Sequence, residues 1–201
     1  MTCTIYILTP SFILAFLPIT LVGYFCIANF AGKLSYEMAK TAASMWMVVM
    51  SLMFYSYWDI NNLPILLGSI IFNYFIGYFL TNKPKKIVLC SGILVNLGLL
   101  IYYKYINFFL DNISIFTGFE YTICNIVLPL GISFFTFTQI AFLVDVYKGE
   151  TKNYNFVTYC EFVTIFPHLI AGQILDHKKM LPQFIDKANY VVNYENISLG
   201  L

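Results

Sequence analysis

Charge is scarce in this sequence, and arginine is absent. Charged residues make up 10% of the 201 residues, all 11 basic residues are lysines, and the formal net charge is +1. A nucleic-acid-binding face needs clustered Lys and Arg well beyond neutrality, so this balance excludes nucleic acid as a partner. Without arginine, the chain also lacks a bidentate fork for phosphate or carboxylate groups.

Metal-binding and disulfide motifs are lacking too. The two histidines, His168 and His177, have no acidic or sulfur companions at fixed spacing, so no metal site is predicted. The five cysteines lie far apart and form no C-x-x-C pair, which predicts small buried hydrophobic residues: Cys3, Cys26, Cys90, Cys124 and Cys160.

Apolar and aromatic residues, in contrast, are abundant. They make up 60% of the chain, with 20 Phe and 16 Tyr. A soluble domain of this length has too little interior to hide so much apolar surface, so we predict an all-α polytopic membrane protein. Residues 1–32 carry no charge and form too long an apolar stretch for a cleaved signal peptide, which predicts a retained first span.

Five segments are long enough to cross a bilayer, which takes about 20 apolar residues in a helix. We predict spans at about Ile5–Phe30 with a kink at Pro18, Ala42–Trp58, Leu63–Leu80, Ile87–Leu110, and Leu130–Tyr147, the last opened by Pro129.

Lysine placement predicts the orientation of these spans, because positive charge is retained on the cytoplasmic side. Lysines follow the first, third and fifth spans, whereas only acidic residues follow the second and fourth. The N-terminus is therefore expected outside, in the inner membrane of a bacterium. Lys104, late in the fourth span, is expected near the outer face.

The next apolar stretch, Phe156–Leu175, breaks this alternation because lysines follow it as well. It contains Glu161, Pro167 and His168, which suit a lipid-facing helix poorly. We predict a re-entrant or broken helical segment packed inside protein; the alternative is an ordinary sixth span. We expect residues 1–201 to form a single membrane-embedded region, and the abrupt finish at "YENISLGL" suggests a longer protein.

Polar residues inside the spans are the candidates for function, since they usually face protein or a water-filled cavity. Gln139 and Asp145 lie in the fifth span, on different faces. Asp145 is either a cavity residue or a boundary charge near Lys148. His168 is either a base or a structural hydrogen-bonding residue. These features alone are compatible with a channel, a transporter or an acyltransferase.

Three motifs in order add a specific resemblance: "YYKYINFF" at 102–109, "LPLGISFFTFTQIAFLVDVYKGE" at 128–150 and "FVTIFPHLIAGQIL" at 162–175. Together they resemble the membrane-bound O-acyltransferase family, in the branch of alginate O-acetyltransferases and their peptidoglycan O-acetylating relatives. The resemblance runs over nearly the whole chain, whereas family members are about twice as long.

The resemblance implies an enzyme that passes acyl groups from a cytoplasmic thioester such as acetyl-CoA, with no bound cofactor. The acceptor would be an extracytoplasmic protein or a cell-envelope or exported polysaccharide. The alternatives are D-alanyl transfer to teichoic acid and a non-catalytic scaffold or transporter-like subunit.

The resemblance also bears on individual residues. The family's catalytic histidine lies in its later half, and no position in this chain matches that motif, so the chain is expected to be inactive alone. Gln173 stands where the branch usually has proline. The residues expected to line or brace an acyl tunnel are Gln139, Asp145, His168 and Gln173.

Overall fold

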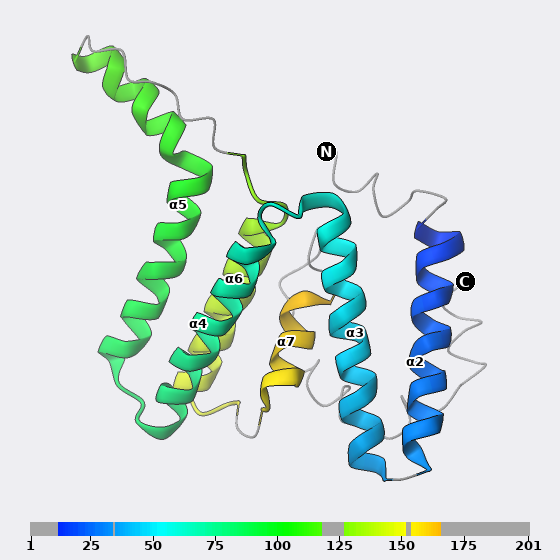
Figure 1. The fold of residues 1–201 in the computed structure, drawn as a ribbon. Coiled ribbons are helices and arrows are strands. Elements are labelled where there is room, and N and C mark those ends of the chain that lie inside the picture. Colours follow the sequence, from blue (N-terminus) through cyan, green and yellow to red (C-terminus); the bar gives the residue numbers. More distant parts are fainter. Residues whose placement is uncertain (1–11, 34, 118–126, 152–153, 166–201) are drawn as a thin grey trace. The chain divides into compact units, whose positions relative to one another are not determined.

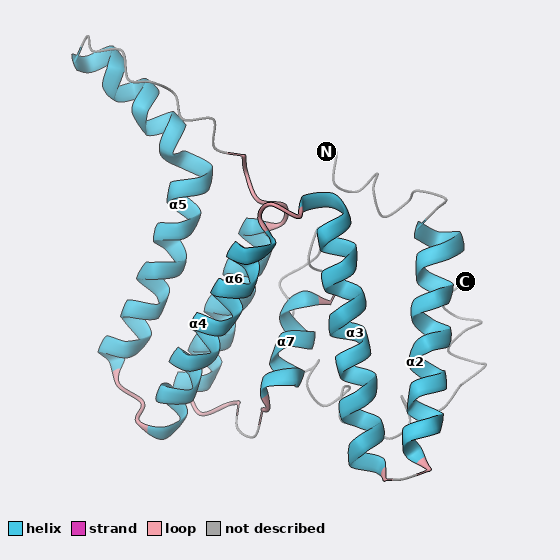
Figure 2. Ribbon diagram, viewed as in Figure 1, coloured by secondary structure: helices cyan, strands magenta, loops and turns pink. Residues whose placement is uncertain are grey.

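The computed structural model describes residues 12–33, 35–117, 127–151 and 154–165, and every regular element in these ranges is helical (Figure 2). The all-α prediction is therefore confirmed for the described part of the chain. The chain divides into two compact units, Met1–Tyr57 with Asn153–Leu201, and Trp58–Lys152. We call them unit 1 and unit 2 and describe each by itself.

Unit 2 is built from three long helices, α4 (Leu63–Asn82), α5 (Lys86–Thr117) and α6 (Ile132–Tyr147). In Figure 1, α4 and α6 run side by side in the same direction, and α5 runs antiparallel to both. The lysine-bearing turn between α4 and α5 consequently lies at the same end of the unit as the C-terminal end of α6.

Local sequence signals explain where these helices begin and end. Pro64 occupies the first turn of α4, where its missing N–H costs no hydrogen bond. Gly131 precedes α6 with φ 70°, a left-handed conformation that glycine adopts without a steric penalty. Helix α5 runs past the predicted end at Leu110 as far as Thr117, and no proline or glycine stands between these two residues.

Unit 1 contains a π-helical turn (η1, Phe12–Phe16), then α2 (Leu17–Gly32), α3 (Tyr36–Asp59, whose last two residues fall in unit 2) and α7 (Phe156–Thr164). Pro18 is the second residue of α2, directly after the π-helical turn. Proline cannot donate a helical hydrogen bond and its ring crowds the preceding turn, so a wider turn there is physically expected. The kink predicted at Pro18 stays a prediction, since the structure places a π-helical turn directly before it.

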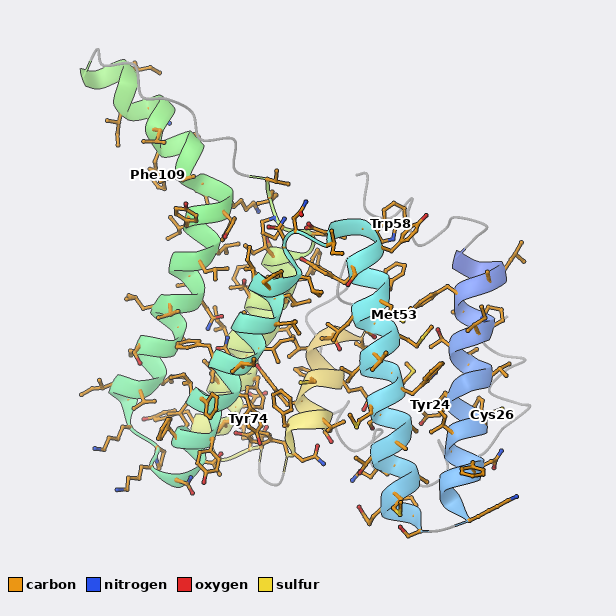
Figure 3. The ribbon with its side chains drawn as sticks, in the orientation of Figure 1. Tyr24, Cys26, Met53, Trp58, Tyr74 and Phe109 are labelled. Atoms are coloured by element: carbon orange, nitrogen blue, oxygen red, sulfur yellow. The ribbon has the colours of Figure 1, made fainter. Side chains whose placement is uncertain are left out.

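Helices α2 and α3 are held together by a close contact at Gly23. The indole N–H of Trp46 donates to the backbone oxygen of Thr20 at 3.0 Å. A Cβ placed on Gly23 would stand 2.4 Å from a ring carbon of Trp46. Figure 3 shows Tyr24 on the facing side of α2, and it packs against the buried pair Ala28 and Ala43. Small residues thus let these two helices approach closely, as in membrane helix pairs.

Helix α7 is short, and the side chains of residues 158–164 are all buried. It begins at a side-chain cap, where Asn155 Oδ1 accepts from the backbone N–H of Thr158 at 2.7 Å. The helix ends before Ile165. The predicted break around Pro167, and with it the re-entrant path, lies outside the described residues.

Two helical stretches in the described part of the chain are long and apolar enough to cross a membrane, Leu63–Asn82 and Lys86–Ile106. Two further helices are apolar but shorter, Leu14–Phe30 and Ile132–Tyr147. The third and fourth predicted spans therefore match the structure closely. The full count of five remains a prediction.

The contact at Gly23 can be tested by Gly23→Ala, with Gly32→Ala in the same helix as the matched control. A methyl group at 23 forces the Trp46 ring away from Thr20, and we expect it to destabilise the chain by about 1–3 kcal/mol. A Cβ at Gly32 meets nothing closer than Ala39 Cβ at 3.9 Å, so the control should unfold like the wild type. Thermal unfolding in detergent is the measurement; equal unfolding of both variants would refute the contact.

Candidate functional site

A cluster of buried polar side chains joins the three helices of unit 2. Gln139 of α6 is fully buried, and its Oε1 atom accepts from Ser69 Oγ at 2.6 Å and from Asn73 Nδ2 at 2.7 Å. Asn73 of α4 is also fully buried, and Asn96 of α5 is 3% exposed. We call Ser69, Asn73, Asn96 and Gln139 the amide cluster.

The two asparagines bond to each other in both directions. Asn96 Nδ2 donates to Asn73 Oδ1 at 2.7 Å, and Asn73 Nδ2 lies 3.1 Å from Asn96 Oδ1. Each side chain also reaches its own helix, since Asn73 Nδ2 is 2.9 Å from the Ser69 backbone oxygen and Asn96 Nδ2 is 2.8 Å from that of Gly92. The amide cluster thereby links α4 to α5 as well as to α6.

These bonds fix which way the Gln139 amide faces. Turning it over would set Gln139 Nε2 against the Asn73 amide nitrogen, which is a donor and cannot accept. The Nε2 atom therefore points away from the amide cluster, and it has no hydrogen-bond partner among the described residues. Thr136, one turn earlier on α6, is also buried with its hydroxyl unpartnered there.

A second polar contact lies at the opposite end of unit 2 from the lysine-bearing turn. Asp59 Oδ2 accepts from the backbone N–H of Leu130 at 3.0 Å, just before α6 begins. Asp59 also accepts from the side-chain amide of Asn62 at 3.0 Å. The carboxylate thus ties the start of α4 to the start of α6, and the left-handed turn at Gly131 presents the amide to it.

Lys104 lies on α5 with its Nζ atom 3.5 Å from Ser133 Oγ and 5.4 Å from the centre of the Tyr105 ring. The first contact is with the first turn of α6, and the second is with an aromatic ring of α5 itself. Lys104 is exposed, so the contact is loose, as expected of a side chain that extends along an apolar helix toward water.

The structure describes two of the four predicted candidate residues. Gln139 lies in the amide cluster, whereas Asp145 is half-buried three turns from the start of α6 and outside the cluster. His168 and Gln173, like His177, lie outside the described residues. Among the described residues, no group of three or more His, Cys, Asp or Glu side chains gathers to hold a metal ion.

Sequence reasoning missed Ser69, Asn73, Asn96 and Glu161. A signal for the first two was present, because polar residues four apart inside an apolar span share one helix face. Asn96 alone in its span gave no such spacing. Glu161 was noted only as unsuited to lipid, yet it is 5% exposed in α7.

Chemically, the amide cluster holds the three helices rigidly and fixes the direction of one hydrogen-bond donor, Gln139 Nε2. It contains no nucleophile with an adjacent base, which acyl transfer through the enzyme would need. Its bonds lie in an apolar interior, where a buried amide left without partners costs about 1–3 kcal/mol. Unit 2 thus has a fixed helix register and an oriented amide at Gln139.

The reciprocal asparagine pair should show energetic coupling in a double-mutant cycle of Asn73→Ala and Asn96→Ala. Each single change leaves partners unsatisfied, so we expect a coupling energy of about 0.5–2 kcal/mol from unfolding in detergent. The control cycle pairs Asn73→Ala with Asn82→Ala, because the side chain of Asn82 is exposed and, within the described ranges, bonds only to the Tyr78 backbone. Strict additivity in the first cycle would show that the pair does not form.

Comparison with known proteins finds relatives that are named for O-acetylation. It is 38% identical to peptidoglycan O-acetyltransferase of Helicobacter pylori over 96% of this chain. It is 34% identical to the probable alginate O-acetylase AlgI of Pseudomonas aeruginosa over 90% of this chain, and 38% identical to that of Azotobacter vinelandii over 67%.

The matches cover less of the relatives than of this chain. The chain spans 41% of the length of the Helicobacter pylori protein and 34% of that of Pseudomonas aeruginosa. No family model matches the chain. No solved structure matches it either. Along almost its whole length, the chain is nevertheless related to the alginate and peptidoglycan O-acetylating branch of the membrane-bound O-acyltransferase family, as its motifs predict.

Proposed function

We propose that this chain forms the N-terminal part of a membrane O-acetyltransferase that modifies a cell-envelope or exported polysaccharide. The observation that carries the proposal is the match to a named O-acetyltransferase and a probable O-acetylase over 90–96% of the chain. The apolar helices of unit 2 support a membrane location. Acetyl-CoA or another acyl thioester on the cytoplasmic side is the proposed donor.

The structure suggests what this part of the enzyme contributes. An acyl group that crosses from a cytoplasmic donor to an outer acceptor needs a protein path, since neither the charged donor nor a polysaccharide enters lipid. In this proposal, unit 2 is a rigid wall of that path, and the amide cluster keeps its helices from sliding. The reacting base is supplied by the later part of the family's sequence.

We further propose the five-span topology with the N-terminus outside, plus the re-entrant segment, within one membrane-embedded region. Support comes from unit 2, where the lysines of the α4–α5 turn and Lys148 after α6 lie at the same end (Figure 1). Asp59 marks the opposite end, where α4 and α6 begin. Apart from Lys104, which lies beside Ser133 near the start of α6, this separation of charge agrees with retention of lysines on the cytoplasmic side.

Acetyl transfer is tested with radiolabelled acetyl-CoA in membrane vesicles, comparing the 201-residue chain with the longer product read from the same gene. We expect label to reach polysaccharide only with the longer product, because the family's histidine is not matched in this chain. Vesicles without either product are the control. Transfer of label by neither product would contradict the proposal for acetyl. If D-alanyl and other thioester donors are also inactive, the result would support the scaffold alternative instead.

The topology is tested with single cysteines in a cysteine-free background, labelled by a membrane-impermeant maleimide. Lys85→Cys and Asn61→Cys are matched positions, since both are exposed and lie in turns at opposite ends of α4. We expect Asn61→Cys to react in intact cells and Lys85→Cys only in inverted vesicles. The reverse pattern would invert the proposed orientation.

A further inference from the structure

Unit 1 contains a buried carboxyl group that no proposed step has yet used. Glu161 lies in α7, whose neighbouring side chains are all buried, and it is 5% exposed. Burying a carboxyl group inside a membrane protein costs free energy. Such a group usually lies on a proton or ion pathway, contacts a substrate or pairs with an opposite charge. No ion pair to Glu161 is found among the described residues.

The two carboxyl oxygens of Glu161 differ in their surroundings. One side of the group hydrogen-bonds to the hydroxyl of Ser44 on α3. The Oε2 atom is buried and has no hydrogen-bond partner among the described residues. Among the described residues, one oxygen of Glu161 is therefore held by a hydroxyl and the other has no hydrogen-bond partner, so the second oxygen is the one that can exchange a proton.

Ser44 begins a stripe of buried oxygen atoms along α3. At 100° per residue, Ser44, Ser51 and Tyr55 fall within about 40° of one another on the helix face. Their exposed fractions are 4%, 1% and 0%. At 1.5 Å per residue the stripe covers about 16 Å of the helix axis, roughly half the hydrocarbon layer. The Glu161 carboxyl stands at the Ser44 end of the stripe, which is nearer to Lys33, before α3, and to Lys40, in its second turn.

Acetyl transfer from a thioester to a hydroxyl releases one proton and takes up another. A carboxyl group such as that of Glu161 can supply the proton that is taken up. The C–S bond breaks and a C–O bond forms, the acceptor hydroxyl loses a proton, and the departing thiolate gains one. In the proposed function, the thiolate forms on the cytoplasmic side and the hydroxyl reacts on the outer side. One proton must therefore be taken up where the other is released.

We propose that Glu161 is a proton donor to the departing thiolate, and that a proton returns to it along the stripe of Ser44, Ser51 and Tyr55. Ser44 and Ser51 stand about 10 Å apart along the helix axis, so water molecules bridge the hydroxyls in this proposal. This inference rests on the proposed function. The neutral carboxyl gives its proton to sulfur and becomes a carboxylate. The proton lost by the acceptor hydroxyl then restores the acid, so the cycle closes without any other reactant.

The first test is the rate of acetyl transfer from acetyl-CoA by the longer gene product with Glu161→Gln. The amide keeps the shape and can still bond to Ser44, but it cannot give up a proton in this way. We expect a fall of about 100-fold, with unchanged thermal unfolding. Glu161→Asp should recover part of the rate, and Glu37→Gln, at an exposed position on α3, should match the wild type. Full activity of Glu161→Gln would overturn the proposal.

The second test does not depend on transfer. Infrared difference spectra of the purified gene product, in H₂O against D₂O, should show the C=O band of a neutral, exchangeable carboxyl that disappears in Glu161→Gln. Ser44→Ala should slow its exchange. A missing band, or one that never exchanges, would overturn the proposal even if Glu161→Gln fails to fold. Should the wild type transfer no acetyl, the proposed function fails, while the infrared result still decides whether Glu161 carries a neutral, exchangeable proton.

Discussion

The hydrogen bonds among Ser69, Asn73, Asn96 and Gln139 are the constraint on which unit 2 depends. Apolar helices slide past one another at little cost, because lipid and protein offer similar apolar contacts. Buried amides remove that freedom, since each must meet its partners at one register. The acceptor oxygen of Gln139 receives two donors from α4, at 2.6 and 2.7 Å, and the pair of asparagines ties α4 to α5. The relative heights of the helices follow from these contacts.

Hydropathy predicted where most helices lie, but not what fixes them together. The window at Leu63–Leu80 matched α4 to within two residues, because both ends carry polar turn residues. The window beginning at Ala42 missed the start of α3 at Tyr36, since residues 36–41 are good helix formers that are too polar for a membrane scale. Ser35, whose hydroxyl accepts from the Met38 backbone, was the available cap signal.

The candidate site was less predictable than the fold for a physical reason. Sequence spacing shows which residues share a face of one helix, but not which faces of different helices meet. Gln139 was identified because it is polar inside an apolar run, whereas its partners 66 and 70 residues away follow only from the packing of α4 on α6. Glu161 shows the same limit, since its burial depends on contacts that composition does not specify.

The two units carry different kinds of polar interior. In unit 2, the amides of the cluster hold helices in place and exchange no proton at ordinary pH. In unit 1, a carboxyl and hydroxyls lie together, and such groups can pass protons. In the proposed function, the first property gives a stiff path for the acyl group and the second gives a means to balance charge.

The central claim is that the polar residues of the apolar helices face protein rather than lipid. Electron cryomicroscopy of the chain in lipid nanodiscs, with a bound antibody fragment for alignment, tests it most directly. The account predicts density for the Gln139 side chain in contact with Ser69 and Asn73. A map in which Gln139 faces lipid, or in which α4 and α6 do not meet at these residues, would contradict it.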